Sequence, residues 1–293
     1  MASLKEIKSR INSVNGTLKI TSAMKMVASS KLRKAQNAIG NLLPYEQQMH
    51  RILADLLTED ISAGDRYVAQ RPVKKAAIVA FSSNSSLCGG FNSMAVKHFR
   101  ETVEQYMEQG LTMDDFLVFP VGKKMAEAVR KMGFQPQGDY SVMADKPSYA
   151  DAAALARHLM DLFSSCAVDR VELVYNHCKS TSVQIPVREV YLPLSMDRQP
   201  ARQEDSSFGQ ADYIVEPSAS GVLEVLLPKV LLLKIYAVLL DANAAEHSAR
   251  TVAMQVATDN GKELLQDLTL QFNKQRQQSI TDELLDIAGG TMV

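Results

Sequence analysis

The chain has 293 residues, of which 46% are hydrophobic and 22% charged, a composition that supports one or two buried cores and excludes a disordered chain. Its longest strongly apolar run, from Val230 to Leu240, contains Lys234 and is shorter than the ~20 residues that cross a bilayer. The formal net charge of -1 excludes a uniformly basic or acidic protein, but it conceals an asymmetry at the N-terminus.

The first predicted element is one long helix from Ser3 to about Leu57. Its apolar and small residues recur in alternating steps of four and three, a heptad pattern typical of paired helices. The seam consists of Ile7, Ile11, Val14, Leu18, Thr21, Lys25, Ala28, Leu32, Ala35, Ile39 and Leu42. A second apolar strip, Ile20, Met24 and Val27, lies on a neighbouring face. We therefore expect this helix to make contacts on two faces.

This helix is also strongly basic. Residues 1 to 40 contain Lys5, Lys8, Arg10, Lys19, Lys25, Lys31, Arg33 and Lys34 against Glu6 alone. Such a segment is expected to bind an acidic partner, and either nucleic acid or an acidic protein surface would serve. No apolar block follows the first basic residues before Ile20, which predicts no secretory signal and a cytosolic location.

Strand and helix patterns alternate between Val73 and Leu194, which predicts a mainly parallel sheet flanked by helices. The expected strands are 76–81, 116–121, 170–176 and 183–192, and the expected helices are 92–107, 123–132 and 149–163. Pro186 marks the last strand as bulged or at an edge. The polar stretch from Asp197 to Gln210 predicts a mobile connection.

The turn after the first strand is the place where a phosphate-binding loop would lie. Its sequence, LCGGFN at residues 87–92, contains no G-x-G-x-x-G and no G-x-x-x-x-G-K-[ST] motif, and no acidic residue follows in an evident ribose-binding place. A tight strand-to-helix turn that needs Gly89 and Gly90 is favoured over a ligand site.

The other polar residues show no pattern of catalysis or metal binding. The serines of residues 82–86 lie outside a G-x-S-x-G motif, and the five histidines are far apart. The three cysteines, Cys88, Cys166 and Cys178, are odd in number and form no C-x-x-C pair, which predicts reduced thiols. Acidic residues near Glu283 are better explained as a solvated helix face. We expect no cofactor, no metal and no active site.

The last predicted element is a second long helix with Pro228 in its first turn. Its heptad residues are Leu231, Ile235, Val238, Ala242, Ala245, Ala249, Val252 and Val256. Asn260-Gly261 would ordinarily favour a turn, but the apolar pattern resumes at Leu265. We therefore expect a long helix with one shift of phase that ends at Gly289-Gly290.

Either terminal helix would be roughly 80 Å long, whereas a middle domain of ~120 residues has a radius of gyration near 14 Å. The predicted segments are an N-terminal helix at 1–60, a central α/β domain at 70–195 and a C-terminal helix at 210–293. A globular helical bundle is the alternative, although the middle of the chain offers few long amphipathic segments for one.

Three segments together resemble the γ subunits of F-type ATP synthases. They are residues 20–33 (ITSAMKMVASSKLR), the turn at residues 87–92 (LCGGFN), and residues 250–261 (RTVAMQVATDNG) with 273–284 (NKQRQQSITDEL). The resemblance implies an antiparallel coiled coil of the terminal helices with a central Rossmann-like α/β domain. It also implies a non-catalytic rotor that couples proton flow to ATP synthesis and hydrolysis.

The same resemblance implies partners and contact residues. The partners would be the α, β, ε and δ subunits and the c ring, on the cytoplasmic face of a bacterial membrane, with no nucleic acid and no small-molecule ligand. The resemblance places Met24, Lys25, Lys31 and Arg33 near acidic loops of β. The resemblance also implies that Arg250, Arg276, Gln277, Thr281 and Glu283 contact the catalytic ring.

This sequence departs from many relatives at Ser83-Asn84-Ser85-Ser86, where they carry a charged loop. It has no cysteine-bearing insertion of the kind found in redox-regulated chloroplast relatives, so thiol switching is not expected. Two other hypotheses stay open: a nucleic-acid-binding coiled coil, because of the basic segment, and a nucleotide-binding α/β enzyme, because of the order of elements and the glycine turn.

Overall fold

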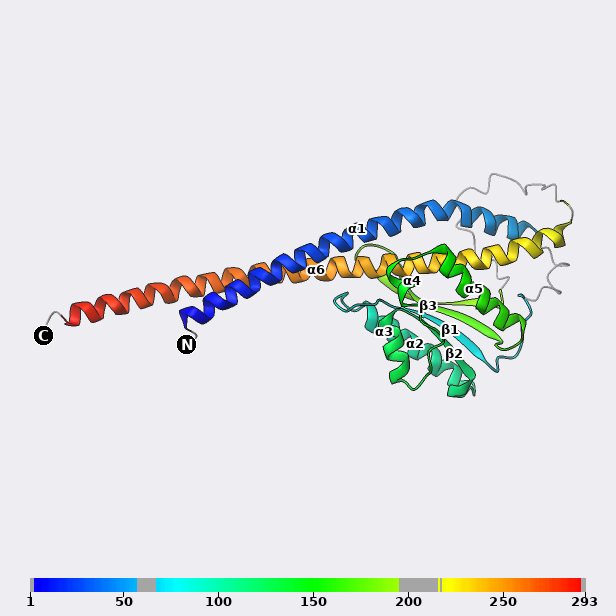
Figure 1. The fold of residues 1–293 in the computed structure, drawn as a ribbon, viewed down its shortest axis with the longest axis horizontal. Helices are drawn as coiled ribbons and strands as arrows, with labels where there is room; N and C mark the ends of the chain where they lie inside the picture. Colours follow the sequence, from blue (N-terminus) through cyan, green and yellow to red (C-terminus); the bar gives the residue numbers. More distant parts are fainter. Residues whose placement is uncertain (1–2, 57–66, 195–215, 217, 291–293) are drawn as a thin grey trace. The chain divides into compact units, whose positions relative to one another are not determined.

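The computed structural model of the chain describes residues 3–56, 67–194, 216 and 218–290. They belong to two compact units, which we call the helix-pair unit (Met1–Ser30 and Arg250–Val293) and the domain unit (Lys31–Ala249). The elements are α1 (Leu4–Leu56), β1 (Ala76–Phe81), α2 (Phe91–Glu108), η2 (Met113–Asp115), β2 (Phe116–Val121), α3 (Lys123–Lys131), α4 (Ser141–Asp145), α5 (Tyr149–Ser164), β3 (Arg170–Cys178), β4 (Gln184–Leu192) and α6 (Ala219–Gly290) (Figure 1). Both long helices contribute residues to each unit.

The helix α6 starts earlier than its sequence pattern predicts. It begins at Ala219, so the prediction that Pro228 lies in the first turn is wrong. The turns before Pro228 are held by tertiary packing, because Leu227 is buried in a cluster with Met49 and Leu53 of α1. A proline removes one helical hydrogen bond, and such packing can offset that loss. The predicted connection from Asp197 to Gln210 lies outside the described residues.

In the helix-pair unit, the two helices meet along the predicted seam. The buried residues of α1 include Ile7 and Ala28, and those of α6 include Met254 and Leu268. The hydroxyl groups of Thr21 and Thr258 are hydrogen-bonded across the pair at 3.0 Å. The pairing is therefore antiparallel, since Leu18, three residues before Thr21, lies against Gly261, three residues after Thr258.

Close approach of α1 explains why the Asn260-Gly261 pair does not break α6. A Cβ atom on Gly261 would lie only 2.7 Å from Cδ2 of Leu18. The glycine therefore serves as the hole into which the leucine side chain fits. The expectation of a long helix that continues through this dipeptide is confirmed, since α6 runs to Gly290 without interruption.

The sheet of the domain unit has the strand order β2-β1-β3-β4. Strand β1 pairs in parallel with β2 and β3, while β4 runs antiparallel to β3. The mainly parallel sheet is therefore confirmed, and the strand that contains Pro186 lies at an edge, where a missing N–H group costs least.

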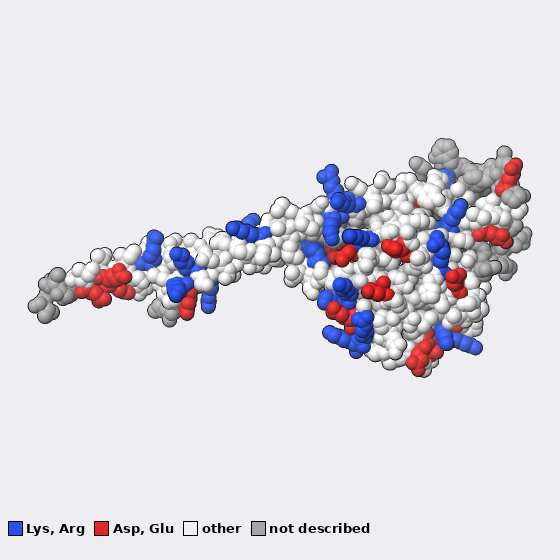
Figure 2. Space-filling model, viewed as in Figure 1, with Lys and Arg blue, Asp and Glu red and all other residues white. Residues whose placement is uncertain are grey.

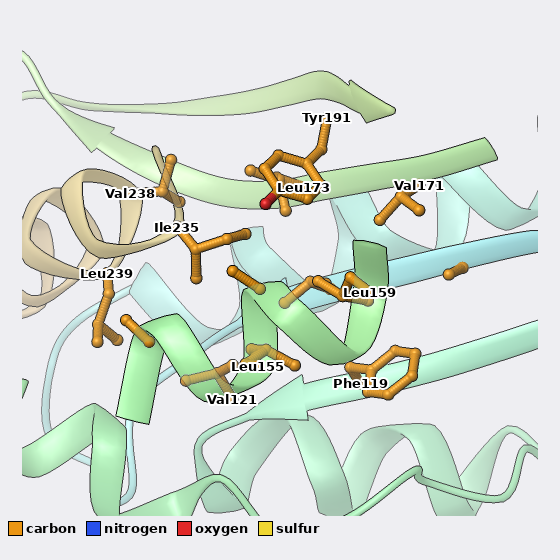
Figure 3. Packing of buried hydrophobic residues seen from close by; sticks show 14 of the residues in the cluster. Phe119, Val121, Leu155, Leu159, Val171, Leu173, Tyr191, Ile235, Val238 and Leu239 are labelled. Atoms are coloured by element: carbon orange, nitrogen blue, oxygen red, sulfur yellow. The ribbon is translucent and has the colours of Figure 1, made fainter. Parts of the chain in front are cut away.

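Helices cover both faces of this sheet. Residues of α2 and α3, such as Phe99 and Met125, are buried with Ile78 and Val118 of the strands. The opposite face is covered by α4, α5 and the middle of α6. There Ile235, Val238 and Leu239 of α6 join Leu155 and Leu159 of α5 in a single buried cluster (Figure 3). The long helix is thus part of the core of the α/β domain.

Candidate functional site

The C-terminal part of α6 projects apolar side chains that nothing in this chain covers. Among the described residues of α6, Leu268 is the last buried one, and the side chains of residues 280–288 are all exposed. Leu285 is 64% exposed and Ile287 is 66% exposed, and Ile280 and Leu284 are exposed beside them. Four large aliphatic side chains so close together on a surface mark an interaction site.

The predicted contact residues of α6 lie among these aliphatic side chains. Steps of three and four residues place Arg276 and Glu283 on one face with Ile280, and Gln277 with Thr281 on the adjacent face. The Thr281 hydroxyl donates to the Gln277 carbonyl oxygen at 2.9 Å, which leaves its oxygen lone pairs free to accept. This surface therefore offers apolar contact together with donors and acceptors.

The C-terminal end of α6 gains little stability from burial among the described residues. An isolated helix of about 15 residues is marginal in water even when its propensity is high. In this segment the apolar side chains cannot contribute burial energy within the chain, because they are exposed. The segment therefore depends on its continuity with the rest of α6 for its helical form.

On α1 of the helix-pair unit, the second apolar strip is also uncovered. Ile20, Val27 and the nearby Met26 are exposed, while Met24 and Lys25 are half-buried. Because Thr21 lies opposite Thr258, Met24 lies near the level of Gln255. Gln255 precedes Thr281 by about 26 residues, or roughly 40 Å along a helix. The unit therefore has two separate candidate surfaces.

The remaining predicted contact residues are distributed differently. Lys31 and Arg33 are exposed and belong to the domain unit. Arg250 is only 8% exposed, so its guanidinium group is enclosed by the chain itself. In the helix-pair unit, acidic side chains gather near the C-terminal end of α6, while basic side chains are spread along the pair (Figure 2). The structure thus brings Gln277, Thr281 and their neighbours together but not the whole predicted set.

The glycine turn is a structural turn that closes a polar network. Gly89 has φ of 58°, a left-handed conformation that favours glycine, whereas Gly90 has φ of −82°. A Cβ atom on Gly90 would approach nothing closer than 3.9 Å, so the expectation that the turn needs both glycines is wrong for Gly90. Cys88, between Leu87 and Gly89, is buried against α6 with Phe91, Ala245 and Ala249.

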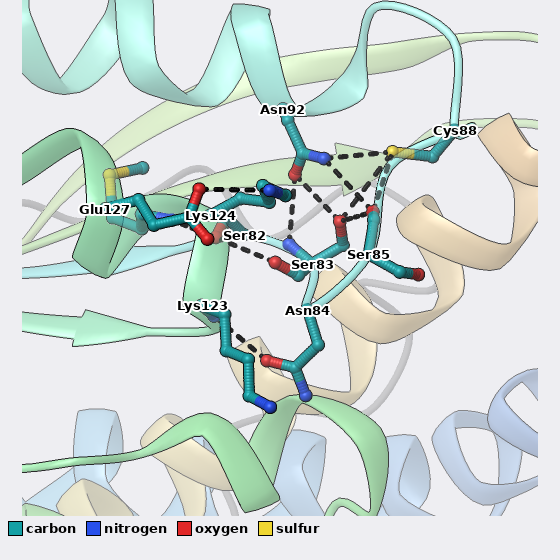
Figure 4. A network of polar contacts seen from close by, with 10 residues as sticks. Ser82, Ser83, Asn84, Ser85, Cys88, Asn92, Lys123, Lys124 and Glu127 are labelled. Atoms are coloured by element: carbon teal, nitrogen blue, oxygen red, sulfur yellow. Dashed lines mark hydrogen bonds and ion pairs between the residues drawn. The ribbon is translucent and has the colours of Figure 1, made fainter.

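Side chains and a carbonyl group of the loop after β1 occupy the first backbone N–H groups of helix α3 (Figure 4). At the start of α3, the amide N–H of Lys123 donates to Oδ1 of Asn84 at 2.9 Å, and the amide N–H of Met125 donates to Oγ of Ser82 at 2.7 Å. The amide N–H of Lys124 donates to the carbonyl oxygen of Ser83 at 3.1 Å. This helix N-terminus therefore has no free N–H groups in its first turn to bind an anion.

The crevice beside this loop, at the carboxyl ends of the parallel strands, is filled as well. Its walls include Phe81 and Val121 at the strand ends and Leu239, Asn243 and Glu246 of α6. The space that remains has a volume of about 10 Å³. That volume holds about one water molecule, whereas nucleotide sites are at least several hundred Å³. The geometry therefore gives no support to the nucleotide-binding hypothesis.

Sequence reasoning missed the polar contacts that fasten the β3–β4 hairpin to α6. The carboxylate of Asp241 accepts from the Cys178 amide at 3.0 Å and contacts Nδ1 of His177 at 2.6 Å. Two helical turns further on, the hydroxyl of Ser248 donates to the carbonyl oxygen of Thr181 at 2.5 Å. The seven-residue spacing of Asp241 and Ser248 was the available signal, since it places both on one face of the helix.

Within the described parts of the chain, no group of three or more His, Cys, Asp or Glu side chains is arranged to hold a metal ion. None of the described helices combines the length and the apolar character needed to span a membrane.

Comparison with known proteins agrees with this arrangement. Residues 3–292 match the family model described as ATP synthase. The chain is 57% identical to the ATP synthase gamma chain of Bacteroides fragilis and 54% identical to that of Phocaeicola vulgatus, in each case over 100% of both chains. Its fold resembles a chain of the mitochondrial ATP synthase of Euglena gracilis, with a TM-score of 0.65 at 19% identity over 99% of this chain and 93% of that chain. The chain belongs to the family of ATP synthase gamma chains.

Proposed function

We propose that this chain is the central-stalk rotor subunit of an F-type ATP synthase and has no active site of its own. The observation that carries the proposal is the exposed aliphatic end of α6, which a surrounding protein would cover. Membership of the gamma chain family supplies the identity of that surrounding protein. A solved structure to which the chain is similar is described as the rotor of a mitochondrial ATP synthase.

The proposed partners follow from the two uncovered surfaces and the family. The α and β subunits would surround the end of α6 and the exposed residues Ile20, Met26 and Val27 of α1. The ε and δ subunits and the c ring would be the other members of the complex, on the cytoplasmic face of a bacterial membrane. The carboxyl edge of the sheet is closed by Asn84 and α6, which supports a role without nucleotide chemistry.

Apolar exposure also favours a protein partner over nucleic acid. Duplex binding is dominated by contacts between basic side chains and phosphates, and it does not require large aliphatic side chains. On α1, however, the exposed apolar side chains near Lys25 are Ile20, Met26 and Val27. A surface of this composition suits an interface with apolar contacts at its centre and basic residues at its rim.

Reconstitution tests the rotor role. Membrane vesicles from which the catalytic sector has been removed are reloaded with α and β subunits, with or without this chain. ATP-driven proton uptake is expected only when the chain is present, because it would form the mechanical link between the two sectors. Equal proton uptake without the chain would contradict the proposal.

The proposed contact residues are tested in the same assay. Replacing Ile280, Leu284 and Ile287 together by serine removes the apolar contact and is expected to lower coupled turnover by about tenfold or more, since each buried aliphatic side chain contributes about 1.5–3 kcal/mol. The control is Lys262→Ala on the same helix, where the side chain is exposed and forms a weak surface pair with Asp259. Equal losses of coupled turnover in the triple-serine variant and in Lys262→Ala would show that these three aliphatic side chains do not form the contact surface.

The polar members of the set are tested one at a time. Arg276→Ala, Gln277→Ala and Thr281→Ala are each expected to reduce the coupling ratio of protons pumped per ATP hydrolysed, because hydrogen bonds to charged or polar partners would be lost. The helix itself should persist, since all three side chains are exposed. Unchanged coupling in all three variants would restrict the contact to the apolar residues.

A further inference from the structure

The middle of α6 is built into the α/β domain by apolar contacts. Five of its residues between Leu231 and Ala242 belong to the cluster that contains the sheet and α5 (Figure 3). Two further alanines, Ala245 and Ala249, pack against the buried loop residues Cys88 and Phe91. This stretch of α6 therefore cannot leave the domain without opening its core.

Polar contacts join the same stretch of α6 to the domain at successive turns. The Tyr191 hydroxyl donates to the carbonyl oxygen of Leu231 at 3.0 Å, and Lys234 pairs with Glu189 at 2.8 Å. Further along, the side-chain amide of Asn243 donates to the carbonyl oxygen of Ala144 at 2.8 Å. The Asp241 and Ser248 contacts with the hairpin complete the series.

The α1 residues of the same unit, 31–56, pack against α6 in two small clusters. In one cluster Leu32 and Ala35 meet Ala244, and in the other Met49 and Leu53 meet residues at the start of α6. No described residue of α1 belongs to either of the two large clusters that enclose the sheet. The α1 segment thus lies on the outside of α6.

Among the described residues, few apolar groups of the α/β domain contact this α1 segment. Cys178 and Leu194 touch the edges of the two small clusters. The charge of Glu46 adds a minor contribution to the raised pKa of the Tyr175 phenol, which burial raises most. These contacts involve partly buried groups, in contrast to the fully buried ones of α6.

The α1 segment is also intrinsically weak as a helix. It contains Gly40 and Pro44, the two residue types that are least favourable in a helix interior. Pro44 has no N–H group to donate to the carbonyl oxygen of Gly40, four residues earlier. No atom outside the helix lies within 4 Å of a Cβ placed on Gly40, so tertiary packing does not require the glycine.

We propose that residues 40–56 of α1 are a brace that opens from α6 independently, while residues 231–249 of α6 stay fixed in the α/β domain. Force applied to the α/β domain then reaches the rest of the chain through α6. The brace stiffens α6 when it is closed and releases it when it is open. This inference concerns the folded chain and stands apart from the proposed rotor role.

Native-state hydrogen exchange of the full chain, followed by mass spectrometry, tests the proposal. Amides of residues 40–53 are expected to exchange at least about tenfold faster than those of residues 231–249 and of β3, because local opening needs less free energy than global unfolding. The urea dependence of exchange in the brace should be weaker than that in β3, since opening of the brace exposes the small cluster around Met49 and Leu53 but neither of the two large clusters that enclose the sheet. Exchange of all three segments with one rate and one urea dependence would overturn the proposal.

A pair of leucine variants adds a matched control. Leu53 is 7% exposed and Leu43, in the same segment, is 46% exposed. Leu53→Ala is expected to speed exchange of residues 40–53 by about 30-fold, the factor that corresponds to ~2 kcal/mol for a buried leucine. Leu43→Ala should change it by no more than about twofold. Equal acceleration of β3 by Leu53→Ala, or failure of that variant to fold, would show that the brace is not independent.

Discussion

At the scale of single residues, one fully buried carboxylate links three elements of the domain unit. Glu172 of β3 is 0% exposed and accepts from Nε of Arg188 at 2.5 Å and from the Tyr106 hydroxyl at 2.5 Å. Arg170 lies 3.2 Å from the same carboxylate, and Arg188 also bonds to Gln105 of α2. The network therefore joins α2, β3 and the edge strand β4.

Removing this carboxylate is predicted to be costly. Glu172→Ala should lower the free energy of unfolding by about 3 kcal/mol, because two arginines and a tyrosine lose their partner in a buried place. Glu104→Ala is the control, since Glu104 forms an exposed pair with Arg100, and it should cost less than about 1 kcal/mol. Urea unfolding measures both, and similar costs would contradict the importance of the network.

The same network predicts a loss of stability at alkaline pH. Burial, and then the hydrogen bond to Glu172, raise the pKa of Tyr106. The pKa of an unfolded tyrosine is about 10, so the folded state keeps a proton that the unfolded state loses above that pH. The stabilisation is complete below about pH 10 and declines as pH rises further.

Urea unfolding at pH 8 and near pH 11 should therefore show a fall in stability. Tyr106→Phe removes one of the responsible protons and should make that fall smaller, although it lowers stability at pH 8 by about 1 kcal/mol through the lost hydrogen bond. Tyr175 and Tyr191, whose pKa values burial also raises, would account for part of the remaining fall. The same pH dependence in the variant and the parent would argue against this assignment.

At the scale of elements, the contact of Leu18 with Gly261 fixes how closely the two helices pair. Gly261→Val should destabilise the helix-pair unit by about 1–3 kcal/mol, because its side chain would occupy the space of Leu18. Gly16→Ala on α1 is the control: nothing lies within 4 Å of a Cβ there, and it should stabilise by about 0.5–1 kcal/mol.

A second substitution separates packing from helix propensity. In Leu18→Ala, the space against Gly261 is opened, so Gly261→Val should then be tolerated with little further loss. Thermal unfolding of the single and double variants gives the coupling between the two positions. If the loss of stability in the double variant equals the sum of the losses in the two single variants, the side chains at positions 18 and 261 do not compete for the same space.

The sequence allowed the elements to be predicted where periodicity was strong. The seam of α1, the continuation of α6 through Asn260-Gly261, and the edge position of the Pro186 strand were all predicted from residue patterns. The start of α6 was not, because tertiary burial of Leu227 outweighs the preference of Pro228 for a first turn. The short helix α4 was missed, since five residues carry too little periodicity to be recognised.

The candidate site could be predicted only in part. The apolar end of α6 is visible as heptad residues that continue to Ile287, but only the structure shows that α1 leaves them uncovered. The enclosure of Arg250 and the capping of α3 by Asn84 depend on contacts between distant parts of the chain. Local sequence carries no signal for such contacts.

At the scale of the whole molecule, the sheet of the domain unit has a carboxyl edge without room for a nucleotide, and the helix pair has an uncovered end. The first property gives no support to nucleotide binding at that edge. The second requires a partner that covers Leu284 and its neighbours. Within the gamma chain family, both properties suit a subunit that transmits force between other subunits.

Direct observation of rotation tests this account best, and the chain supplies its own attachment point. Cys166, between α5 and β3, is an exposed free cysteine, whereas Cys88 is buried and burial raises the pKa of the half-buried Cys178 thiol. A bead linked to Cys166 on a complex with surface-fixed α and β subunits is predicted to turn in one direction while ATP is supplied. ATP hydrolysis by the assembled complex with the bead at rest would contradict the account.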